Sequence, residues 1–329
     1  MRLLFTRMGD SMVKNEPMKN TLLLLVTLFL FACSNDTPKE EVQQEESPPN
    51  LPYVSKGKIE RLPNFSSQYI DARNIDIWLP EGYDSTDKSY PVIYMHDGQN
   101  LYDANNTFNK QEWEVDEIAG TLMSQGKLTE FIVVGVWNNG EMRYTEYFPQ
   151  KAMDNISQDF INEKMEGRDI KKEALADNYL KFLTQELKPH IDANFRTLPD
   201  RENTTVMGSS MGGLISMYAI CEYPEVFGKA GCLSTHWVGI FEQNEEIPNA
   251  FNTYLTENMP PPANHKIYFD YGDRTLDSLY KPHQVMIDQT MKTLGYSDSL
   301  WMTMEFKGAD HSEQAWAARL DIPLQFLFN

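Results

Sequence analysis

Residues 208–212 read Gly-Ser-Ser-Met-Gly, a G-x-S-x-G pattern with Ser210 at its centre. The β-branched run before this pattern predicts a strand, and the residues from Leu214 onward predict a helix. A strand that turns sharply into a helix exposes the middle residue of the turn, and the two glycines keep side chains out of the crowded bend. The pattern predicts that Ser210 is a nucleophile, held beside a helix N-terminus that favours negative charge.

A nucleophilic serine needs a base to take its proton, and the base needs a carboxylate to orient it. His311 lies between the last predicted strand and the last predicted helix, where a strand's carboxyl end would carry it to Ser210. The other histidines precede Ser210, precede the candidate acids or project from a predicted helix. Asp273 and Asp277 both follow the strand predicted over residues 266–271, and their spacing does not separate them. Asp273 also suits a turn, and Asp277 also suits a helix N-cap.

Attack of a serine on a carbonyl carbon also requires two backbone N–H groups that face the negative charge developing on the carbonyl oxygen. The amide of Met211, directly after the nucleophile, is predicted to be one of them. The second is expected in the loop after the strand at residues 90–95, which reads His-Asp-Gly-Gln-Asn. Because Gly98 allows close backbone approach, the amide of Gln99 is predicted to be this second donor.

The segments that must position these residues alternate between strand and helix patterns. This alternation predicts an α/β fold with a mostly parallel central sheet and helices on both faces. Residues 138–173 and 235–264 break the rhythm, and we interpret them as loops or a small cap insertion over the site. Strands are predicted at residues 57–65, 68–79, 90–95, 131–137, 204–207, 229–233, 266–271 and 300–306. Helices are predicted at residues 113–125, 174–191 (stopped near Pro189), 214–221, 280–294 and 313–328.

The composition restricts the partners of the chain. A formal charge of −19 over 329 residues argues against binding nucleic acid or an anionic membrane through a basic face. The sequence has no Cys–His cluster with metal-ligand spacing and no glycine-rich phosphate loop, so no cofactor or metal is expected. Cys221 and Cys232 either form a disulfide or remain free thiols, and the sequence does not decide between these alternatives.

The N-terminal region predicts export and lipid anchoring. An apolar run at residues 21–32 follows lysines and is too short to span a bilayer, as expected of a signal peptide. It ends Leu-Phe-Ala-Cys, which resembles the lipobox of bacterial lipoproteins, so residues 1–33 are predicted to be a signal that ends at a lipid-modified Cys33. An ordinary secretory signal is the alternative, and the true start codon stays open. Residues 34–52 are predicted to be a disordered tether, and residues 53–329 a single hydrolase domain.

Beyond these patterns, the chain resembles the bacterial putative-esterase family of the α/β-hydrolase fold. That family includes feruloyl and acetylxylan esterases, S-formylglutathione hydrolase and enterochelin-type siderophore esterases. The resemblance runs from about Ile70 to the C-terminus. A G-x-x-x-L-D pattern of related sequences matches residues 272–277, which favours Asp277 as the acid and keeps Asp273 as the alternative. The resemblance rests on residues 94–103 with Trp113, and on residues 208–213, 223–228 and 308–316.

The resemblance also suggests residues that contact substrate. Arg143 and Glu146 lie in a segment that resembles the family's Asn/Arg/Glu-bearing loop. We favour an ion pair between them that pins the loop; the alternative is that Arg143 holds an anionic substrate group. His236 and Trp237 follow the strand at residues 229–233 and are expected to face the acyl or alcohol side of the substrate.

Together these features predict a serine carboxylic-ester hydrolase that forms an acyl-enzyme on Ser210. The expected substrate is a carbohydrate-linked acetyl or feruloyl ester or another small ester. A siderophore esterase, an acyltransferase of the same fold and a non-catalytic surface binding protein are the alternatives. The expected location is the cell envelope, with membrane contact only through the lipid anchor and with no nucleic-acid partner. The sequence does not determine the ester or the oligomeric state.

Overall fold

The computed structural model describes residues 51–165 and 170–329. The expectations for the signal peptide, for Cys33 and for nearly all of the tether lie outside these residues. Within the described ranges, no helix is both long and apolar enough to cross a membrane.

The described chain is built on one eight-stranded sheet in the order β1-β2-β4-β3-β5-β6-β7-β8. The three strands from β1 to β4 in this order are antiparallel neighbours, and all pairs from β4 to β8 are parallel. This confirms the predicted α/β class. The strands are β1 (Lys58–Phe65), β2 (Arg73–Leu79), β3 (Val92–His96), β4 (Ile132–Val136), β5 (Thr204–Ser209), β6 (Lys229–Leu233), β7 (Lys266–Gly272) and β8 (Trp301–Phe306).

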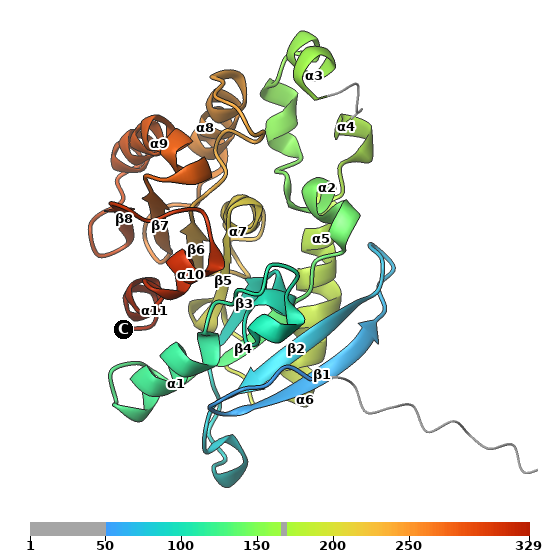
Figure 1. Cartoon of the computed structure of the whole chain (residues 1–329), viewed down its shortest axis with the longest axis vertical. Helices are drawn as coiled ribbons and strands as arrows, with labels where there is room; N and C mark the ends of the chain where they lie inside the picture. Colours follow the sequence, from blue (N-terminus) through green and yellow to red (C-terminus); the bar gives the residue numbers. More distant parts are fainter. Residues whose placement is uncertain (1–50, 166–169) are drawn as a thin grey trace, which may run out of the picture. The chain divides into compact units, whose positions relative to one another are not determined.

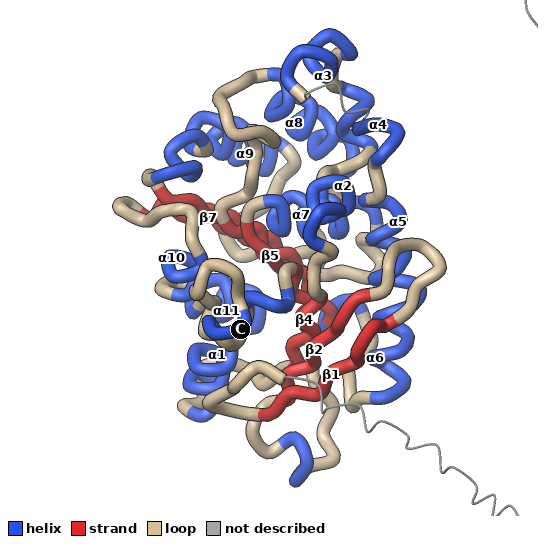
Figure 2. The backbone as a smooth tube through the Cα atoms, turned by 45° about the vertical axis from the view of Figure 1, so that its right-hand side comes forward, coloured by secondary structure: helices blue, strands red, loops and turns tan. Residues whose placement is uncertain are grey.

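Helices cover both faces of the sheet (Figures 1 and 2). Alternate residues of one strand point to opposite faces, so Ile93 and Met95 pack with α1 and α11, while Val92 and Tyr94 pack with the helices of the other face. The helices are α1 (Val115–Ser124), α2 (Arg143–Tyr147), α3 (Gln158–Lys164), α4 (Ile170–Glu173), α5 (Ala176–Lys181), α6 (Lys188–Asn194), α7 (Met211–Glu222), α8 (Glu246–Asn258), α9 (Lys281–Thr293), α10 (Glu313–Ala317) and α11 (Asp321–Phe328).

Parallel pairing brings the carboxyl ends of the inner strands to one edge of the sheet. Met95 of β3 pairs with Met207 of β5, and Ser209 of β5 pairs with Leu233 of β6. The loops that follow β3, β5, β6, β7 and β8 therefore open on the same side, and they carry most of the predicted site residues.

The prediction that the helix at residues 174–191 stops near Pro189 is wrong. The helix widens into a π-helical segment, η6 (Phe182–Leu187), and continues as α6 to Asn194. Pro189 falls in the first turn of α6, directly after the widened segment. In a first turn the missing N–H of proline costs little, and the π segment adjusts the hydrogen bonds before it.

The two segments interpreted as loops or a small cap contain helices, and one predicted helix is divided. Residues 235–264 contain the helix α8, which has about three and a half turns. Residues 138–173 contain α2, α3 and α4 as well as loops. The helix predicted over residues 313–328 is divided into α10 and α11.

Cys221 on α7 and Cys232 on β6 are buried free thiols, which resolves the alternative left open by the sequence.

Candidate active site

Ser210 sits at the sharp turn between β5 and α7. Its backbone has φ 58° and ψ −121°, a conformation that costs free energy for a residue with a side chain. Contact requires glycine at position 208, where a Cβ would lie 2.9 Å from the Cα of Gly212. A Cβ on Gly212 would make ordinary contact with the Cβ of His96 at 3.4 Å. The turn thus holds Ser210 as the N-cap of α7, half-buried at the sheet edge.

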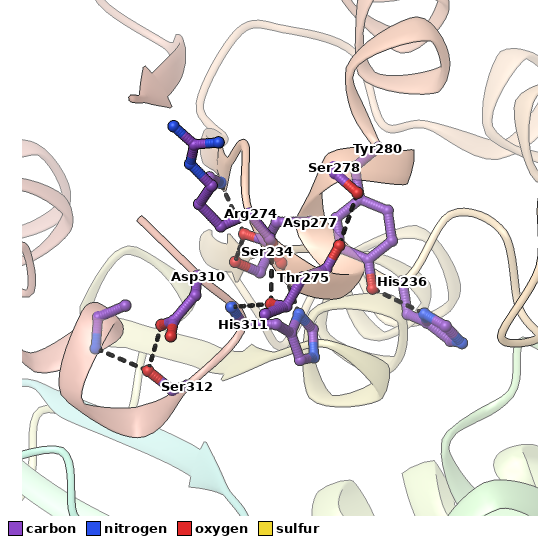
Figure 3. A network of polar contacts seen from close by, with 12 residues as sticks. Ser234, His236, Arg274, Thr275, Asp277, Ser278, Tyr280, Asp310, His311 and Ser312 are labelled. Carbon is purple, nitrogen blue, oxygen red and sulfur yellow. Dashed lines mark hydrogen bonds and ion pairs between the residues drawn. The ribbon is translucent and has the colours of Figure 1, made fainter. Parts of the chain in front are cut away.

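Asp277 and His311 form a close pair beside this turn (Figure 3). The Nδ1 atom of His311 lies 2.5 Å from Oδ1 of Asp277. Asp277 has no exposed surface, and its Oδ2 accepts hydrogen bonds from the Gly272 amide and the Ser234 hydroxyl, each at 2.6 Å. These contacts fix the orientation of the carboxylate, and its Oδ1 selects the tautomer of His311 in which Nδ1 carries the hydrogen and Nε2 is free to accept a proton.

Asp273, the alternative acid, does not contact His311 through its carboxylate. Its Oδ1 accepts a hydrogen bond from the Gly308 amide at 2.8 Å, and its side chain is 36% exposed. It pins the loop that carries His311 rather than the imidazole itself. A Cβ on Gly272 would lie 2.2 Å from the Ala309 carbonyl oxygen, so glycine is needed where this loop crosses the end of β7.

Met211 lies at the turn, whereas Gln99 lines a separate pocket and its loop approaches the turn through Asp97, whose Oδ2 would lie 3.5 Å from a Cβ on Gly212. Met211 is the first residue of α7, and Gln99 lies in a short 3₁₀ helix, η2 (Gly98–Asn100). Amides in the first turn of a helix have no acceptor within that helix. Gly98 packs against the backbone of β4, where a Cβ would lie 2.4 Å from the Gly135 carbonyl carbon, and this close approach places η2 beside the sheet edge.

Arg143 pairs with Asp97, which corrects the expected Arg143–Glu146 ion pair. The Nε and Nη2 atoms of Arg143 donate to the two carboxylate oxygens of Asp97 at 2.7 and 2.8 Å. Glu146 is instead held by Arg73 at 2.6 and 2.8 Å, with both side chains buried. Burial opposes the charge of Asp97, but the Arg143 charge and its hydrogen bonds, with those of Asn138, leave the pKa of Asp97 below its ordinary value.

His236 is buried on the pocket wall and bonded to Tyr280. Its Nδ1 lies 2.8 Å from the Tyr280 hydroxyl, which in turn interacts with the Ser210 side chain. Burial, with smaller effects from the His311 and Arg143 charges, lowers the pKa of His236 to about 3. His236 is therefore a neutral hydrogen-bonding group near neutral pH.

The prediction that Trp237 faces the substrate is wrong. Its indole is buried, and its Nε1 donates to Gln284 at 2.8 Å. Its ring packs against Phe251 and Phe269 in the core. Only His236 of this dipeptide lines the pocket.

A pocket of about 1060 Å³ is lined by some of these groups, and Gln99, Trp237, Asp273 and Asp277 are not among its lining residues. Its lining includes both the turn at Ser210 and the imidazole of His311, together with residues from the two segments interpreted as insertions. Phe108 and Phe241 stand at its rim and are among the most exposed large apolar side chains in the described chain. The lining residues used below are Asp97, Arg143, Ser210, His236, Phe241 and His311.

Sequence reasoning missed Ser234, Tyr280 and the pocket carboxylate Glu313. Glu313 accepts hydrogen bonds from Asn109 at 2.8 Å and from Asn100 at 3.4 Å. The Glu313 and Tyr280 positions follow His311 and Asp277 closely in sequence, which was a usable signal. Ser234 offered none beyond its place at the end of a predicted strand.

Comparisons with known proteins identify the family of the chain. A family model described as "Putative esterase" matches residues 66–326. The Bacillus subtilis protein YbbA is 26% identical over 265 residues, which cover 78% of this chain and 92% of YbbA. An endo-1,4-β-xylanase/feruloyl esterase of Xylanibacter ruminicola is 26% identical over 84% of this chain, but the match covers 32% of that protein.

Solved structures share the fold at low sequence identity. A ferulic acid esterase superposes with a TM-score of 0.61 at 19% identity, covering 83% of this chain and 98% of that one. The enterobactin esterase FES of Shigella flexneri superposes with a TM-score of 0.60 at 16% identity, covering 84% of this chain and 60% of that one. Since the family model spans most of the chain, this protein belongs to the putative-esterase family and is a carboxylic ester hydrolase of the α/β-hydrolase fold.

Proposed function

We propose that the protein hydrolyses its ester through an acyl-enzyme on Ser210. The observation that carries the proposal is the 2.5 Å Asp277–His311 pair in the pocket that Ser210 lines. The Nδ1 atom of His311 is engaged by Asp277, so its Nε2 is the nitrogen available to the nucleophile. Asp277 stabilises the imidazolium that forms when Ser210 gives up its proton.

The bond changes follow from these roles. His311 takes the Ser210 proton as Oγ attacks the ester carbonyl, and the amides of Met211 and Gln99 hold the oxyanion of the tetrahedral intermediate. His311 then returns the proton to the alkoxide oxygen as the C–O bond breaks, which releases the alcohol. Water repeats the sequence on the acyl-enzyme, with His311 again as base, and releases the acid and free Ser210.

The direct test is the Ser210→Ala variant. We expect p-nitrophenyl acetate hydrolysis to fall by on the order of 10⁴-fold or more, with an unchanged melting temperature, because only the nucleophile is lost. Mass spectrometry after treatment with an organophosphonate should find the label on Ser210 in the wild-type protein. Full residual hydrolysis by the variant would contradict the proposal, and an active wild type labelled at another residue would contradict the choice of nucleophile.

For the substrate, we propose a neutral carbohydrate-linked ester, acetyl or feruloyl. The feruloyl esterase relatives and the aromatic rim residues Phe108 and Phe241 support an aryl acyl group. Carboxylates outnumber cations in the pocket lining, and Asp97 already neutralises Arg143. Such a lining disfavours a multiply charged anion.

A siderophore ester is the second candidate because the enterobactin esterase shares the fold. A ferric catecholate complex is such an anion, so the two candidates make opposite predictions. A panel of acetylated xylan, feruloylated sugar and ferric siderophore esters, compared by kcat/KM, tests them. A higher kcat/KM for the ferric siderophore would overturn the carbohydrate proposal.

We also propose that the protein is a lipoprotein of the cell envelope, anchored through Cys33. The support is the lipobox-like sequence that ends the apolar run. Metabolic labelling with a palmitate analogue should mark the wild-type protein and not a Cys33→Ser variant. Labelling of both proteins, or recovery of unlabelled wild type in the soluble fraction, would contradict the anchor.

A further inference from the structure

Ser234 lies behind the Asp277–His311 pair, on the side away from the imidazole. It follows β6 and has no exposed surface. Its hydroxyl oxygen lies 2.6 Å from Oδ2 of Asp277. The same oxygen lies 2.9 Å from Nε1 of Trp316 and 2.9 Å from Nη2 of Arg319. Figure 3 shows Ser234 and His311 both close to Asp277.

These three contacts fix the direction of the hydroxyl proton. A serine hydroxyl has one proton to donate and two lone pairs to accept with. The indole of Trp316 and the guanidinium of Arg319 only donate, so together they occupy both lone pairs. The one proton of Ser234 is therefore left for Asp277, which only accepts when ionised.

The backbone of Ser234 is held as firmly as its side chain. Its amide donates to Oδ1 of Asp270 at 3.0 Å, and Asp270 is paired with Arg319 at 2.9 and 3.1 Å. Its φ of 40° is unfavourable for a residue with a Cβ. A strained residue persists only where its surroundings over-determine it, and this one is fixed by Arg319 and Asp270 together.

We infer that Ser234 is a positioning residue for the proposed reaction. With the Gly272 amide, it occupies Oδ2 of Asp277, so that Oδ1 alone faces His311. The carboxylate then has one orientation, and the imidazole is aimed by a single oxygen. The contacts from Arg319 through Ser234 to Asp277 thus fix the orientation of the His311 imidazole. Ser234 itself does not contact the substrate. The inference rests on the proposed roles of Asp277 and His311.

A purely structural hydroxyl, present only to satisfy Arg319 and Trp316, predicts different behaviour. Its loss would lower stability but leave the kinetics of folded enzyme unchanged. A positioning hydroxyl affects kcat, because it acts when His311 carries charge, and leaves KM unchanged. Without the Ser234 donor on Oδ2, more of the negative charge of Asp277 lies on Oδ1, the oxygen that faces His311. This favours the imidazolium and moves the acid limb of the kcat/KM profile to higher pH.

The other ionisable groups around the imidazole do not account for such a shift. They are Tyr280 at the start of α9, His236 after β6 and Glu313 on α10. None of the three hydrogen-bonds to Ser234, so a substitution at that position leaves their partners in place.

The experiment compares Ser234→Ala and Ser234→Gly with wild type, Ser210→Ala and Thr235→Val. The glycine variant removes the hydroxyl and also relieves the positive φ, so it protects against a misfolded alanine variant. Thr235→Val is the matched control, because its buried hydroxyl donates to the Cys232 carbonyl rather than to Asp277. Melting temperature, kcat, KM and the pH profile are measured for each.

We expect both Ser234 variants to lose about tenfold in kcat with KM within twofold of wild type, and Thr235→Val to keep its kcat. The acid limb should move to higher pH in both Ser234 variants and should stay at its wild-type position in Thr235→Val. Folded Ser234→Gly with wild-type kcat and an unmoved limb would overturn the inference while leaving the proposed function intact. Activity retained in Ser210→Ala would instead overturn the proposed function.

Discussion

Two buried carboxylates each follow a strand of the parallel sheet, and each pairs with a nitrogen-bearing side chain that lines the pocket. Asp97 follows β3 and binds Arg143 through two parallel hydrogen bonds. Asp277 follows β7 and binds His311 through one. The positions are equivalent by topology, because both strands end at the same edge of the parallel sheet.

The partner decides what each pair can do. A guanidinium keeps its charge at every relevant pH, and that of Arg143 donates two hydrogen bonds to Asp97. The pair is therefore a fixed structural link, called the brace below, between Asp97 before η2 and Arg143 at the start of α2. An imidazole gains and loses a proton near neutral pH, so the His311 pair can move a proton to and from Ser210. One sheet edge thus carries a brace on one side of the nucleophile and a proton carrier on the other.

The largest effect expected from breaking either pair is on kcat in Asp277→Asn. A carboxamide has one oxygen where the carboxylate uses two, Oδ1 toward Nδ1 of His311 and Oδ2 toward the Gly272 and Ser234 donors. The oxygen is held by the two donors, so the NH2 group faces His311 and stabilises the wrong tautomer of the imidazole. We expect kcat to fall by on the order of 10³-fold. Asp273→Asn should lose less than tenfold in kcat, with a lower melting temperature, because Asp273 contacts the Gly308 amide and Arg274 and not the imidazole. A larger loss in Asp273→Asn would reverse the assignment of the acid.

Arg143→Met breaks the other pair. It leaves the Asp97 charge partly buried without its cation, which should cost about 2 kcal/mol of unfolding free energy after allowance for solvent at the half-buried guanidinium. Because Asp97 precedes η2, the Gln99 amide should shift and kcat/KM should fall about tenfold.

The double variant Asp97→Asn/Arg143→Met separates the two effects of breaking this brace. It should recover most of the stability, since no charge is left unpaired, but not the activity. Chemical denaturation and steady-state kinetics measure both. Recovery of activity with stability would show that the pair braces the fold and not the oxyanion loop.

The sheet and the turn at Ser210 were predictable because their signals are local. An apolar run such as residues 90–95 predicts a buried strand from its own composition. The G-x-S-x-G pattern predicts a tight strand-to-helix turn because such a turn leaves no room for side chains beside the serine. Helix α8 was equally local: Ile247, Phe251 and Leu255 share one face of it, but the surrounding Asn, Glu and Pro favoured a loop interpretation.

The partners of charged residues were not predictable, because they are long-range. Sequence proximity favoured Glu146 as the partner of Arg143, but the actual partner, Asp97, is 46 residues away. Glu146 on α2 pairs instead with Arg73 on β2. For the same reason, the spacing of Asp273 and Asp277 could not show which of them pairs with His311. What separates them is where the loop carrying His311 crosses β7, and that crossing is set by Gly272 meeting the Ala309 carbonyl.

A smaller effect is expected from the buried histidines His96 and His236, which are not proposed to transfer a proton. Burial, partly offset for His96 by Asp97, lowers the pKa of both His96 and His236 to about 3. Unfolding exposes them to their ordinary value near 6.5, so between these limits the unfolded state binds more protons and stability falls as pH falls. Near pH 5, each histidine should contribute a slope of about 1.4 kcal/mol per pH unit.

His236→Asn should remove one such contribution from the measured slope of unfolding free energy against pH, while the acid limb of the kcat/KM profile keeps its position. Urea denaturation of the wild-type protein from pH 4.5 to pH 6.5 measures this slope, which corresponds to an uptake of about one proton per buried histidine on unfolding. An unchanged slope would show that His236 is protonated in the folded protein.

The smallest expected effect is at the pocket rim, beyond both pairs. Phe241 is 86% exposed, and its ring lies 5.8 Å from that of His236, so it can cover an aryl acyl group without supporting the fold. In Phe241→Ala, KM for methyl ferulate should rise about threefold, the loss of one aromatic contact worth about 0.7 kcal/mol, and the melting temperature should hold. Val285→Ala is the matched control, since Val285 is exposed on α9 away from the pocket lining. An equal change in p-nitrophenyl acetate hydrolysis would mean that Phe241 acts on the proton-carrying pair through His236, and the rim would then belong to the catalytic side of the comparison.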